Sequence, residues 1–390
     1  MTDNYMPGRH FLQIPGPSNV PDSVLRAMAQ PVIDHRGPEF PELTFGILEK
    51  LRPIFNTTGS IFIYPSSGTG GWECALLNAL SPGDKVLAFE TGHFATLWKN
   101  VAENLGLHIV WIPGDWRHGI NPSLVEEKLS EDSKHEIKAV LAVQTETSTG
   151  VTSQIPRIRA AIDAAKHPAL FLVDTVSSLA CTVFRHDDWG VDVTVSGSQK
   201  GLMLPPGLSF NAVSEQALAR AKSSTAQHSY WRWDTILENN QLGYFPYTPN
   251  TNLLYGLDEA LTLLHREGMD NVLARHARLA EATRRAVTAW GLENLCMNPE
   301  EYCNSLTAVL VPEGYDADVL RKIILERFNM SLGTGLGRLK GPIFRIGHLG
   351  DFNDLMLAGT LSGIEMGLAL ADIPHSSGGV DAALEFLATN

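Results

Sequence analysis

A chain of 390 residues, 44% hydrophobic and 19% charged, is long enough for a large domain with a smaller companion and has an ordinary globular composition. Its formal net charge of −13 argues against nucleic acid or an anionic membrane as partner, because an acidic surface repels both. No run approaches the roughly 18 apolar residues of a membrane span. The first 20 residues lack the apolar core of a signal peptide. Four cysteines without metal-type spacing predict a cytoplasmic protein with reduced thiols and no metal site.

Apolar spacing predicts a regular alternation of strands and helices after an extended, proline-rich arm at residues 1–20. The predicted strands are 61–64, 85–89, 107–112, 139–143, 169–173 and 191–195, with another beginning near 205–210. The predicted helices are 22–29, 40–55, 72–80, 94–105, 122–129, 155–166, 214–223 and 252–290, the last broken near Gly268. Two aromatic-rich segments, 230–234 and 243–249, are predicted to be loops.

The alternation indicates an α/β fold with a mainly parallel sheet covered by helices on both faces. From residue 291 the pattern changes to strand 306–311, helix 318–328, a glycine-rich loop, strand 342–346 and helix 352–371. We therefore expect a large domain at 21–290 and a small α/β domain at 291–390, which the arm is a candidate to join. In such sheets ligands bind beyond the carboxyl ends of the strands, so the residues that follow the strands are the candidates for a shared site.

One lysine follows the strand at 191–195 after a small polar turn, Ser196-Gly197-Ser198-Gln199. A sharp turn there would hold the Lys200 amine at a fixed point beyond the strand, as Schiff-base chemistry requires. On this segment alone, an ordinary surface lysine remains the simpler interpretation.

The turn Ser67-Gly68-Thr69-Gly70 lies between a strand and a helix. Free backbone N–H groups and the positive end of the helix dipole would bind a phosphate there, with hydroxyl groups as further donors. Glycine-rich turns without a ligand are also common. The segment lacks the lysine of a P-loop and the spacing of a dinucleotide fingerprint.

Asp174 ends an almost wholly apolar strand, where an unpaired carboxylate would be costly to bury. It could cap the turn that follows it. It could instead pair with the ring nitrogen of pyridoxal phosphate and keep that nitrogen protonated, so that the ring acts as an electron sink. A phosphate cradle, a carboxylate, an amine and an aromatic side chain together meet the requirements of that one cofactor.

The chain resembles the class V, fold-type I pyridoxal-phosphate aminotransferases, in particular the serine–glyoxylate and alanine–glyoxylate branch. The motifs that carry the resemblance run in order along nearly the whole chain: Ser67-Gly68-Thr69-Gly70, Ser148-Thr149-Gly150-Val151, Val173-Asp174-Thr175-Val176-Ser177-Ser178-Leu179, Ser196-Gly197-Ser198-Gln199-Lys200 and Phe344-Arg345-Ile346-Gly347. The fold that this implies has a seven-stranded sheet in the large domain and a smaller C-terminal α/β domain.

The resemblance also implies a role for each matching residue. Lys200 would be the Schiff-base lysine and Asp174 the partner of the pyridine nitrogen. The remaining cofactor-binding residues would be Ser67, Gly68, Thr69 and Gln199 around the phosphate, Phe94 stacked on the ring, Ser148 near the phenolic side, Val176, and Thr248 reaching the neighbouring subunit's phosphate. A homodimer with shared active sites follows, with a tetramer left open. Thr69 stands where some relatives carry histidine, and Phe245 where the alanine–glyoxylate relatives carry tyrosine.

Arg345 lies between apolar residues of a predicted strand. It could be an outward-facing residue of an edge strand, whereas the resemblance makes it the arginine that binds the substrate α-carboxylate in a bidentate pair. The loop Gly333–Gly337 precedes a strand rather than following one, so we assign it to flexibility near the substrate entrance. Arg232 could recognise an acidic group or lie in an interface, and His35 is interpreted as structural.

These residues predict a two-stage transamination in which Lys200 moves the α-proton of the amino donor to C4′ of the cofactor. Serine is the favoured donor to glyoxylate, giving hydroxypyruvate and glycine, and alanine and aspartate are the alternatives. A cysteine desulfurase would need a mobile catalytic cysteine, and Cys303 has no loop signature for that role. A non-catalytic dimer module of the same fold is the alternative from another class, which the presence of both Asp174 and Lys200 disfavours.

Overall fold

The computed structural model describes residues 7–390, so the first six residues of the predicted arm lie outside the described part of the chain. A seven-stranded sheet forms the larger half of the molecule, in the order β2-β10-β9-β8-β5-β3-β4. All of its neighbouring pairs are parallel except those of β10, which runs antiparallel to β2 and β9. The strands are β2 (Ser60–Tyr64), β3 (Lys85–Phe89), β4 (His108–Ile112), β5 (Ile137–Val143), β8 (Leu170–Asp174), β9 (Val193–Gly197) and β10 (Ser209–Val213).

Helices cover both faces of this sheet, which explains why its central strands are apolar throughout. In β8, for example, Phe171 and Val173 pack into one hydrophobic cluster, while Leu170 and Leu172 pack into the other. The first cluster also contains side chains of α2 (Phe40–Phe55), α5 (Pro122–Glu131), α6 (Ile155–Ala164) and α9 (Thr251–Glu267). The second contains side chains of α3 (Gly68–Ala79), α4 (His93–Asn104), α7 (Glu215–Ala221) and α8 (Trp233–Asn240).

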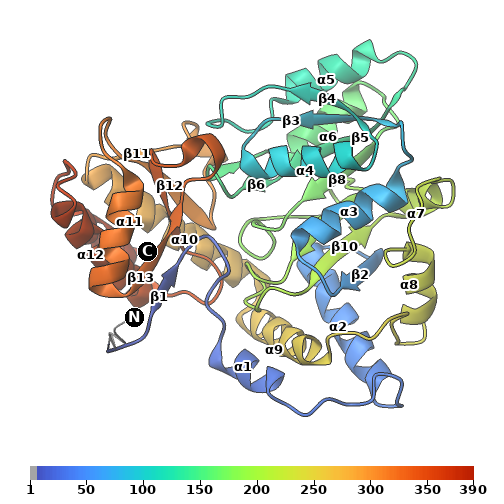
Figure 1. Cartoon of the computed structure of the whole chain (residues 1–390), viewed down its shortest axis with the longest axis horizontal. Helices are drawn as coiled ribbons and strands as arrows, with labels where there is room; N and C mark the ends of the chain where they lie inside the picture. The colour runs from blue at the N-terminus through green and yellow to red at the C-terminus, as the bar shows by residue number, and fades with distance from the viewer. Residues whose placement is uncertain (1–6) are drawn as a thin grey trace.

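A second sheet of five strands lies beside the first, on the left of Figure 1, in the order β1-β13-β14-β12-β11. Its strands are β1 (Phe11–Gln13), β11 (Glu293–Asn294), β12 (Leu306–Leu310), β13 (Met330–Thr334) and β14 (Ile343–Gly347). The helices α10 (Met269–Ala289), α11 (Ala317–Phe328), α12 (Asp354–Leu370) and α13 (Gly379–Thr389) contribute to its hydrophobic cluster. The remaining elements are α1 (Asp22–Met28), η1 (Pro299–Glu301), η2 (Gly337–Leu339) and the small hairpin of β6 (Thr145–Glu146) and β7 (Val151–Thr152).

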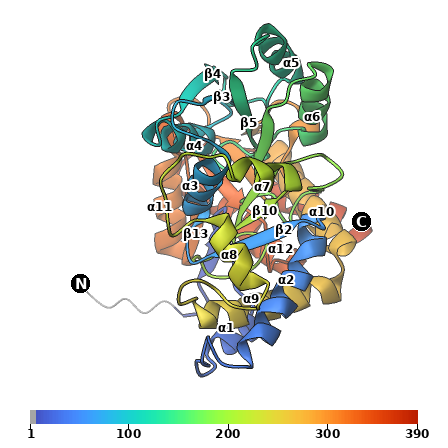
Figure 2. The same ribbon diagram turned by 90° about the vertical axis from the view of Figure 1, so that its right-hand side faces the viewer.

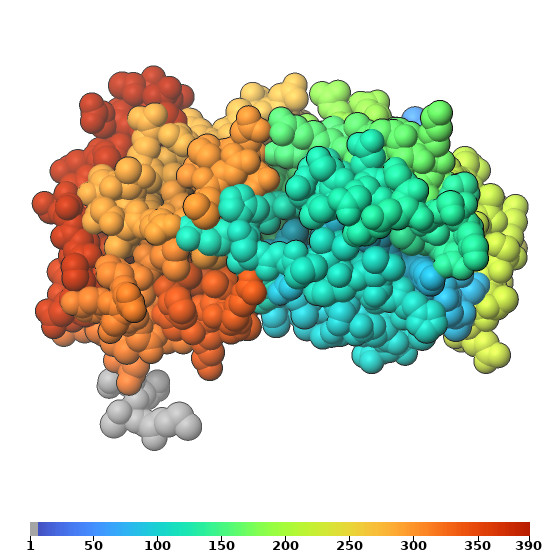
Figure 3. Space-filling view, turned by 90° about the horizontal axis from the view of Figure 1, so that it is seen from above, coloured from blue at the N-terminus to red at the C-terminus, as the bar shows by residue number. Residues whose placement is uncertain are grey.

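The two parts form two lobes side by side in the space-filling view (Figure 3), and the side view shows α1, α2 and α9 together at the lower end of the larger lobe (Figure 2). The chain crosses between the lobes twice. It first runs from β1 in the small sheet to α1 and later returns through α9 and α10, which meet at Gly268. No helix among residues 7–390 is long and apolar enough to span a membrane.

The structure confirms the predicted α/β architecture and corrects several elements. The segment 230–234 is not wholly a loop, because Trp233 begins helix α8 and is fully buried against Phe62. Helix α3 begins at Gly68 rather than residue 72. The predicted loop Gly333–Gly337 is also partly wrong, because Gly333 and Thr334 end strand β13, which pairs with both β1 and β14. The sequence prediction had no counterpart for α13.

Candidate active site

A cavity of about 240 Å³ lies beyond the carboxyl ends of β2, β5, β8 and β9, where an α/β sheet binds its ligands. Eight of the predicted site residues meet in its wall: Ser67, Gly68, Thr69, Phe94, Asp174, Val176, Gln199 and Lys200. The wall is completed by Gly16, Trp72, Val143, Thr145, Thr147 and Ser177. Segments from residue 16 to residue 200 therefore converge on one small chamber.

The amino end of helix α3 forms one wall of the cavity. Among the described residues, no side chain caps this helix end, and Ser67 precedes it in an extended conformation. A Cβ atom on Gly68 would lie 2.8 Å from Cγ2 of Val176, so the backbone can approach the cavity here only without a side chain. The helix end thus offers backbone N–H groups and a positive dipole to an anion.

Asp174 ends β8 and is almost completely buried, with 4% of its surface exposed. Its Oδ1 accepts a hydrogen bond from the backbone N–H of Val176 at 2.6 Å, and its Oδ2 accepts one from the indole Nε1 of Trp72 at 2.8 Å. Burial raises the pKa of Asp174 to about 7, although both hydrogen bonds act in the opposite direction. Such a carboxyl group is well suited to pair with a basic nitrogen in the cavity.

Lys200 follows β9 and the turn that ends it, and only 8% of its surface is exposed. Burial, together with the nearby charge of Arg345, lowers the pKa of its amine to about 8. The amine donates a hydrogen bond to the backbone carbonyl of Pro15, in the arm that crosses the site. A lysine that loses its proton near neutral pH can act as a nucleophile and as a base.

Glu146 is a buried carboxylate that organises the entry into α4. Its Oε2 accepts from the N–H of Ala95, and its Oε1 accepts from the N–H groups of Phe94 and Ser148. Ser148 also donates its hydroxyl to Glu146 at 2.6 Å and accepts from the N–H of His93. Ser148 therefore supports the helix that presents Phe94 to the cavity, and its own side chain does not line the cavity wall.

Arg345 lies on β14, which is flanked by β13 and β12 and is not an edge strand. Only 7% of its surface is exposed. Its Nε donates to the carbonyl of Thr334 at 2.7 Å, and one terminal nitrogen donates to the carbonyl of Thr147 at 2.6 Å. Thr147 lines the cavity, so strand β13 and the turn between β6 and β7 together hold the guanidinium group next to it. No carboxylate is hydrogen-bonded to Arg345 in residues 7–390, which suits it for an anionic substrate group.

Three other predicted residues lie away from the cavity wall. Thr248 is exposed in the segment between α8 and α9, and His35 is part of a turn before α2. Arg232 forms an ion pair with Asp234 and is half-exposed. Conversely, the sequence prediction gave no role to Trp72 or Gly16, although both line the cavity.

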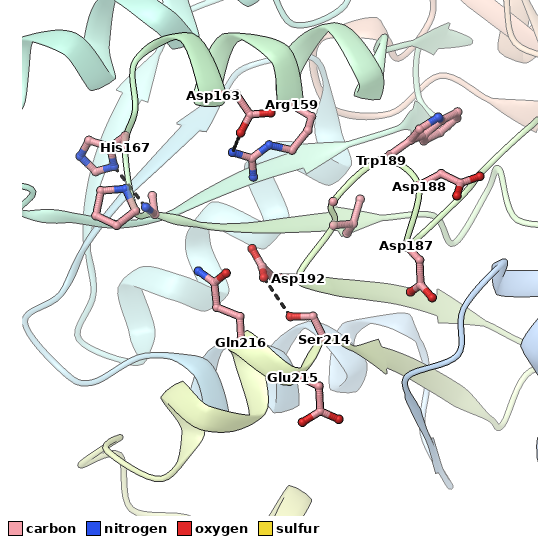
Figure 4. A pocket seen from close by; sticks show the side chains of 14 residues that line it. Arg159, Asp163, His167, Asp187, Asp188, Trp189, Asp192, Ser214, Glu215 and Gln216 are labelled. Carbon is pink, nitrogen blue, oxygen red and sulfur yellow. Dashed lines mark hydrogen bonds and ion pairs between the residues drawn. The ribbon is translucent and has the colours of Figure 1, made fainter.

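A second, more open cavity of about 750 Å³ lies at the amino ends of β8 and β9, at the opposite end of these strands from the first cavity (Figure 4). It is bordered by residues that precede β8 and β9 and by Ser214, which follows β10. The Asp192 carboxylate accepts a hydrogen bond from Ser214, and Arg159 pairs with Asp163. Two pairs of the labelled groups bind each other there, whereas the smaller cavity brings Lys200 and Asp174 together.

A profile of the family Aminotransferase class-V matches residues 10–337. The chain belongs to the class-V aminotransferases. It is 48% identical to a serine–glyoxylate aminotransferase of Methylorubrum extorquens, covering 98% of this chain and 97% of the relative, and 46% identical to one of Arabidopsis thaliana, covering 98% and 96%. An L-aspartate–glyoxylate aminotransferase of Paracoccus denitrificans is 42% identical, covering 97% of this chain and 96% of the relative.

Solved structures agree with this membership. A pyridoxamine–pyruvate aminotransferase of Mesorhizobium loti superposes with a TM-score of 0.92 at 28% identity, over 100% of this chain and 99% of that one. A ureidoglycine–glyoxylate aminotransferase of Bacillus subtilis gives 0.90 at 25% identity, over 99% and 100%. The seven-stranded mostly parallel sheet and the smaller mixed sheet thus match the predicted fold-type I architecture.

Class-V aminotransferases use pyridoxal 5′-phosphate, and the cavity fits that cofactor. The uncapped end of α3 suits its phosphate, Asp174 suits its ring nitrogen, and the Lys200 amine suits its aldehyde. The side-chain oxygen of Gln199 is buried without a hydrogen-bond partner among the described residues, so an N–H or O–H group of a ligand in the cavity would satisfy it.

Proposed function

We propose that this aminotransferase moves the amino group of serine to glyoxylate, forming hydroxypyruvate and glycine. The observation that carries the proposal is the 45–48% identity, over nearly the whole chain, to three serine–glyoxylate aminotransferases. The cavity adds support. Among the described residues that line the cavity, Lys200 has the only basic side chain. Arg345 lies next to the cavity, hydrogen-bonded to Thr147 in its wall. One arginine is enough for a donor whose side chain is small and uncharged.

The proposed mechanism assigns each step to a residue of this chain. Arg345 binds the α-carboxylate of the amino acid in a bidentate pair and orients its α-carbon toward Lys200. The Lys200 amine takes the α-proton from the donor and later gives it up again. Its lowered pKa favours both transfers, because part of the amine is then unprotonated near neutral pH. When bound, pyridoxal 5′-phosphate supplies an electron-accepting ring for the charge left on the donor carbon.

Other residues hold and orient the cofactor in this proposal. Asp174 would pair with the ring nitrogen and hold it protonated, and the Phe94 ring would cover one face of the pyridine. The Ser67–Thr69 turn and the side-chain NH₂ group of Gln199 would bind the phosphate. Val176 packs against the turn, as its close approach to Gly68 supports. Ser148 acts through Glu146 and α4 rather than from the cavity wall.

We further propose a homodimer in which Thr248 reaches the phosphate of the partner's cofactor, with a tetramer as the larger alternative. Thr248 is exposed, and the same region carries exposed apolar side chains, with Leu242 at 67% and Phe45 at 46%. Gly243 packs beside Phe45, which places Leu242 near the same surface. Light scattering would test this assembly, because a monomer at micromolar concentration would refute it.

The proposed organisation keeps an arm at 1–20, a large domain at 21–290 and a small domain at 291–390. Its support is that the small sheet has its own hydrophobic cluster, to which the last part of α10 also contributes. A cytoplasmic location is proposed as well, because all four cysteines are buried and free rather than joined in disulfides.

A single-turnover experiment tests the choice of donor. Loss of the cofactor's visible absorbance is followed after mixing with serine, alanine or aspartate, and serine should react fastest. Aspartate is the main alternative donor, because this chain is 42% identical to the L-aspartate–glyoxylate aminotransferase of Paracoccus denitrificans. Equal rates, or a faster reaction with aspartate, would refute the serine assignment. Lys200→Ala should bind the cofactor without the visible band of the wild type.

A further inference from the structure

Trp72 contacts Asp174, the carboxylate that we propose to pair with the ring nitrogen of the cofactor. It lies in the second turn of α3, lines the cavity and has 3% of its surface exposed. Its indole Nε1–H donates to Oδ2 of Asp174 at 2.8 Å, while the N–H of Val176 donates to Oδ1 at 2.6 Å. With a fixed donor on each oxygen, the carboxylate plane cannot rotate without breaking a hydrogen bond.

A second tryptophan holds the Trp72 ring in place. The Trp98 ring, from α4, stacks on it with ring centroids 5.8 Å apart and an angle of 14° between the planes. The Nε1 of Trp98 is buried and has no hydrogen-bond partner among the described residues. The two rings therefore share one packing environment, but only Trp72 reaches Asp174.

We propose that Trp72 is a positioning residue for Asp174, whose indole N–H fixes the carboxylate in the orientation that meets the ring nitrogen of the cofactor. This inference rests on the proposed pairing of Asp174 with that nitrogen. The bond also favours the ionised carboxylate, because it stabilises the charge without supplying a proton. That contribution matters at this site, where burial and the neighbouring Glu146 both raise the pKa of Asp174, and only hydrogen bonds and Lys200 lower it.

The test compares two ligands on the cofactor-free protein. Dissociation constants are measured by equilibrium dialysis for pyridoxal phosphate and for its analogue with carbon in place of the ring nitrogen. Trp72→Phe keeps an aromatic ring in the stack and removes the N–H. It should weaken pyridoxal phosphate about tenfold, the effect of losing one hydrogen bond to a charged group, and change binding of the carbon analogue by less than twofold.

Trp98→Phe is the matched control, because it alters the same stack and touches no hydrogen bond of Asp174. It should leave the ratio of the two dissociation constants unchanged. Equal weakening of both ligands by Trp72→Phe, or no weakening of either, would overturn the positioning role. If the wild-type protein binds both ligands equally, the pairing of Asp174 itself fails, and the role of Trp72 fails with it.

A measurement on proteins with an intact Trp72 covers the case in which Trp72→Phe does not fold. In protein labelled with ¹⁵N on the indoles of its eight tryptophans, one N–H resonance should shift with a midpoint near pH 7, the pKa of Asp174. Because Lys200 titrates near pH 8, Lys200→Ala should retain that step. Asp174→Asn should abolish it. The absence of any such resonance in the wild-type protein would overturn the inference.

Discussion

Glu146 offers the sharpest test of how this site is held in shape. The carboxylate is 1% exposed and accepts four hydrogen bonds, from the N–H groups of Phe94, Ala95 and Ser148 and from the Ser148 hydroxyl. Gly92 precedes α4 and offers no side chain as a cap, so Glu146 takes that role from a neighbouring strand. Glu146→Gln keeps the shape of the side chain while removing the charge and one acceptor oxygen.

The expected loss follows from these contacts. A glutamine NH₂ group in place of Oε2 would face the N–H of Ala95, and in place of Oε1 it would face three donors. At least one donor is then buried without an acceptor, at about 1–3 kcal/mol. The favourable interaction of the charge with the helix dipole is lost too, at about 0.3–1 kcal/mol. The free energy of unfolding should therefore fall by about 3 kcal/mol.

Urea denaturation of the cofactor-free protein, followed by circular dichroism at one fixed protein concentration, measures this change. Glu90→Gln is the matched control. Glu90 follows strand β3, and its side chain is 23% exposed. It accepts one hydrogen bond from Trp116 at 2.9 Å and forms an ion pair with Arg338 at 3.7 Å. Its substitution should cost less than about 1 kcal/mol. If Glu146→Gln is no more destabilising than this control, Glu146 does not organise α4 as described.

Three further changes have defined outcomes. Gly16→Ala should weaken cofactor binding at least about tenfold, because the φ of Gly16 is +96° and a Cβ atom there would lie 2.5 Å from Nζ of Lys200. Gly8→Ala is the control, because Gly8 has a φ of +90° but no atom within 4 Å of an added Cβ. Equal effects of the two substitutions would contradict the steric reason. Arg345→Lys should raise the KM for serine at least about tenfold without weakening cofactor binding, because lysine cannot form the bidentate pair. An unchanged KM would count against Arg345 as the residue that binds the substrate α-carboxylate. Burial lowers the pKa of His276 to about 4, so the unfolded chain binds more protons than the folded chain between pH 6.5 and 4, and stability falls as the pH drops through that range. His276→Gln should remove about 3 kcal/mol of this loss, as measured by urea titrations at several pH values. Parallel curves of unfolding free energy against pH for the two proteins would refute this.

The local pattern was enough to predict most of the large sheet and the centre of the site. Asp174 and Lys200 follow apolar strands, so their positions at one sheet edge come from local sequence plus the rule that ligands bind there. Trp72 was not identified, because a tryptophan in an apolar helix is ordinarily a core residue. Its role depends on a partner, Asp174, from an element far along the chain.

Several of the elements that sequence analysis missed depend on pairing with distant strands. Three residues among prolines, Phe11–Gln13, form a strand only because Met330–Leu332 lies parallel to them. The glycine in β13 weakens its local strand signal, yet β1 and β14 pair with that strand from either side. Trp233 was placed in a loop because aromatic clustering hid a helix start, which Asn78 stabilises by accepting a hydrogen bond from its N–H.

The pairing of β1 with β13 also constrains how the protein is made. Strand β1 leaves the ribosome long before β13, its only sheet partner among residues 7–390, and the segment after β1, around Ile14, packs against the backbone of Gly347. At about 5–20 residues per second, the nascent arm waits on the order of tens of seconds for that partner. Throughout this time the large sheet can fold, but Gly16 cannot yet take its place in the wall of the cavity. Cofactor capture should therefore follow synthesis of β13, and a truncation before β13 should leave an exposed strand prone to aggregation.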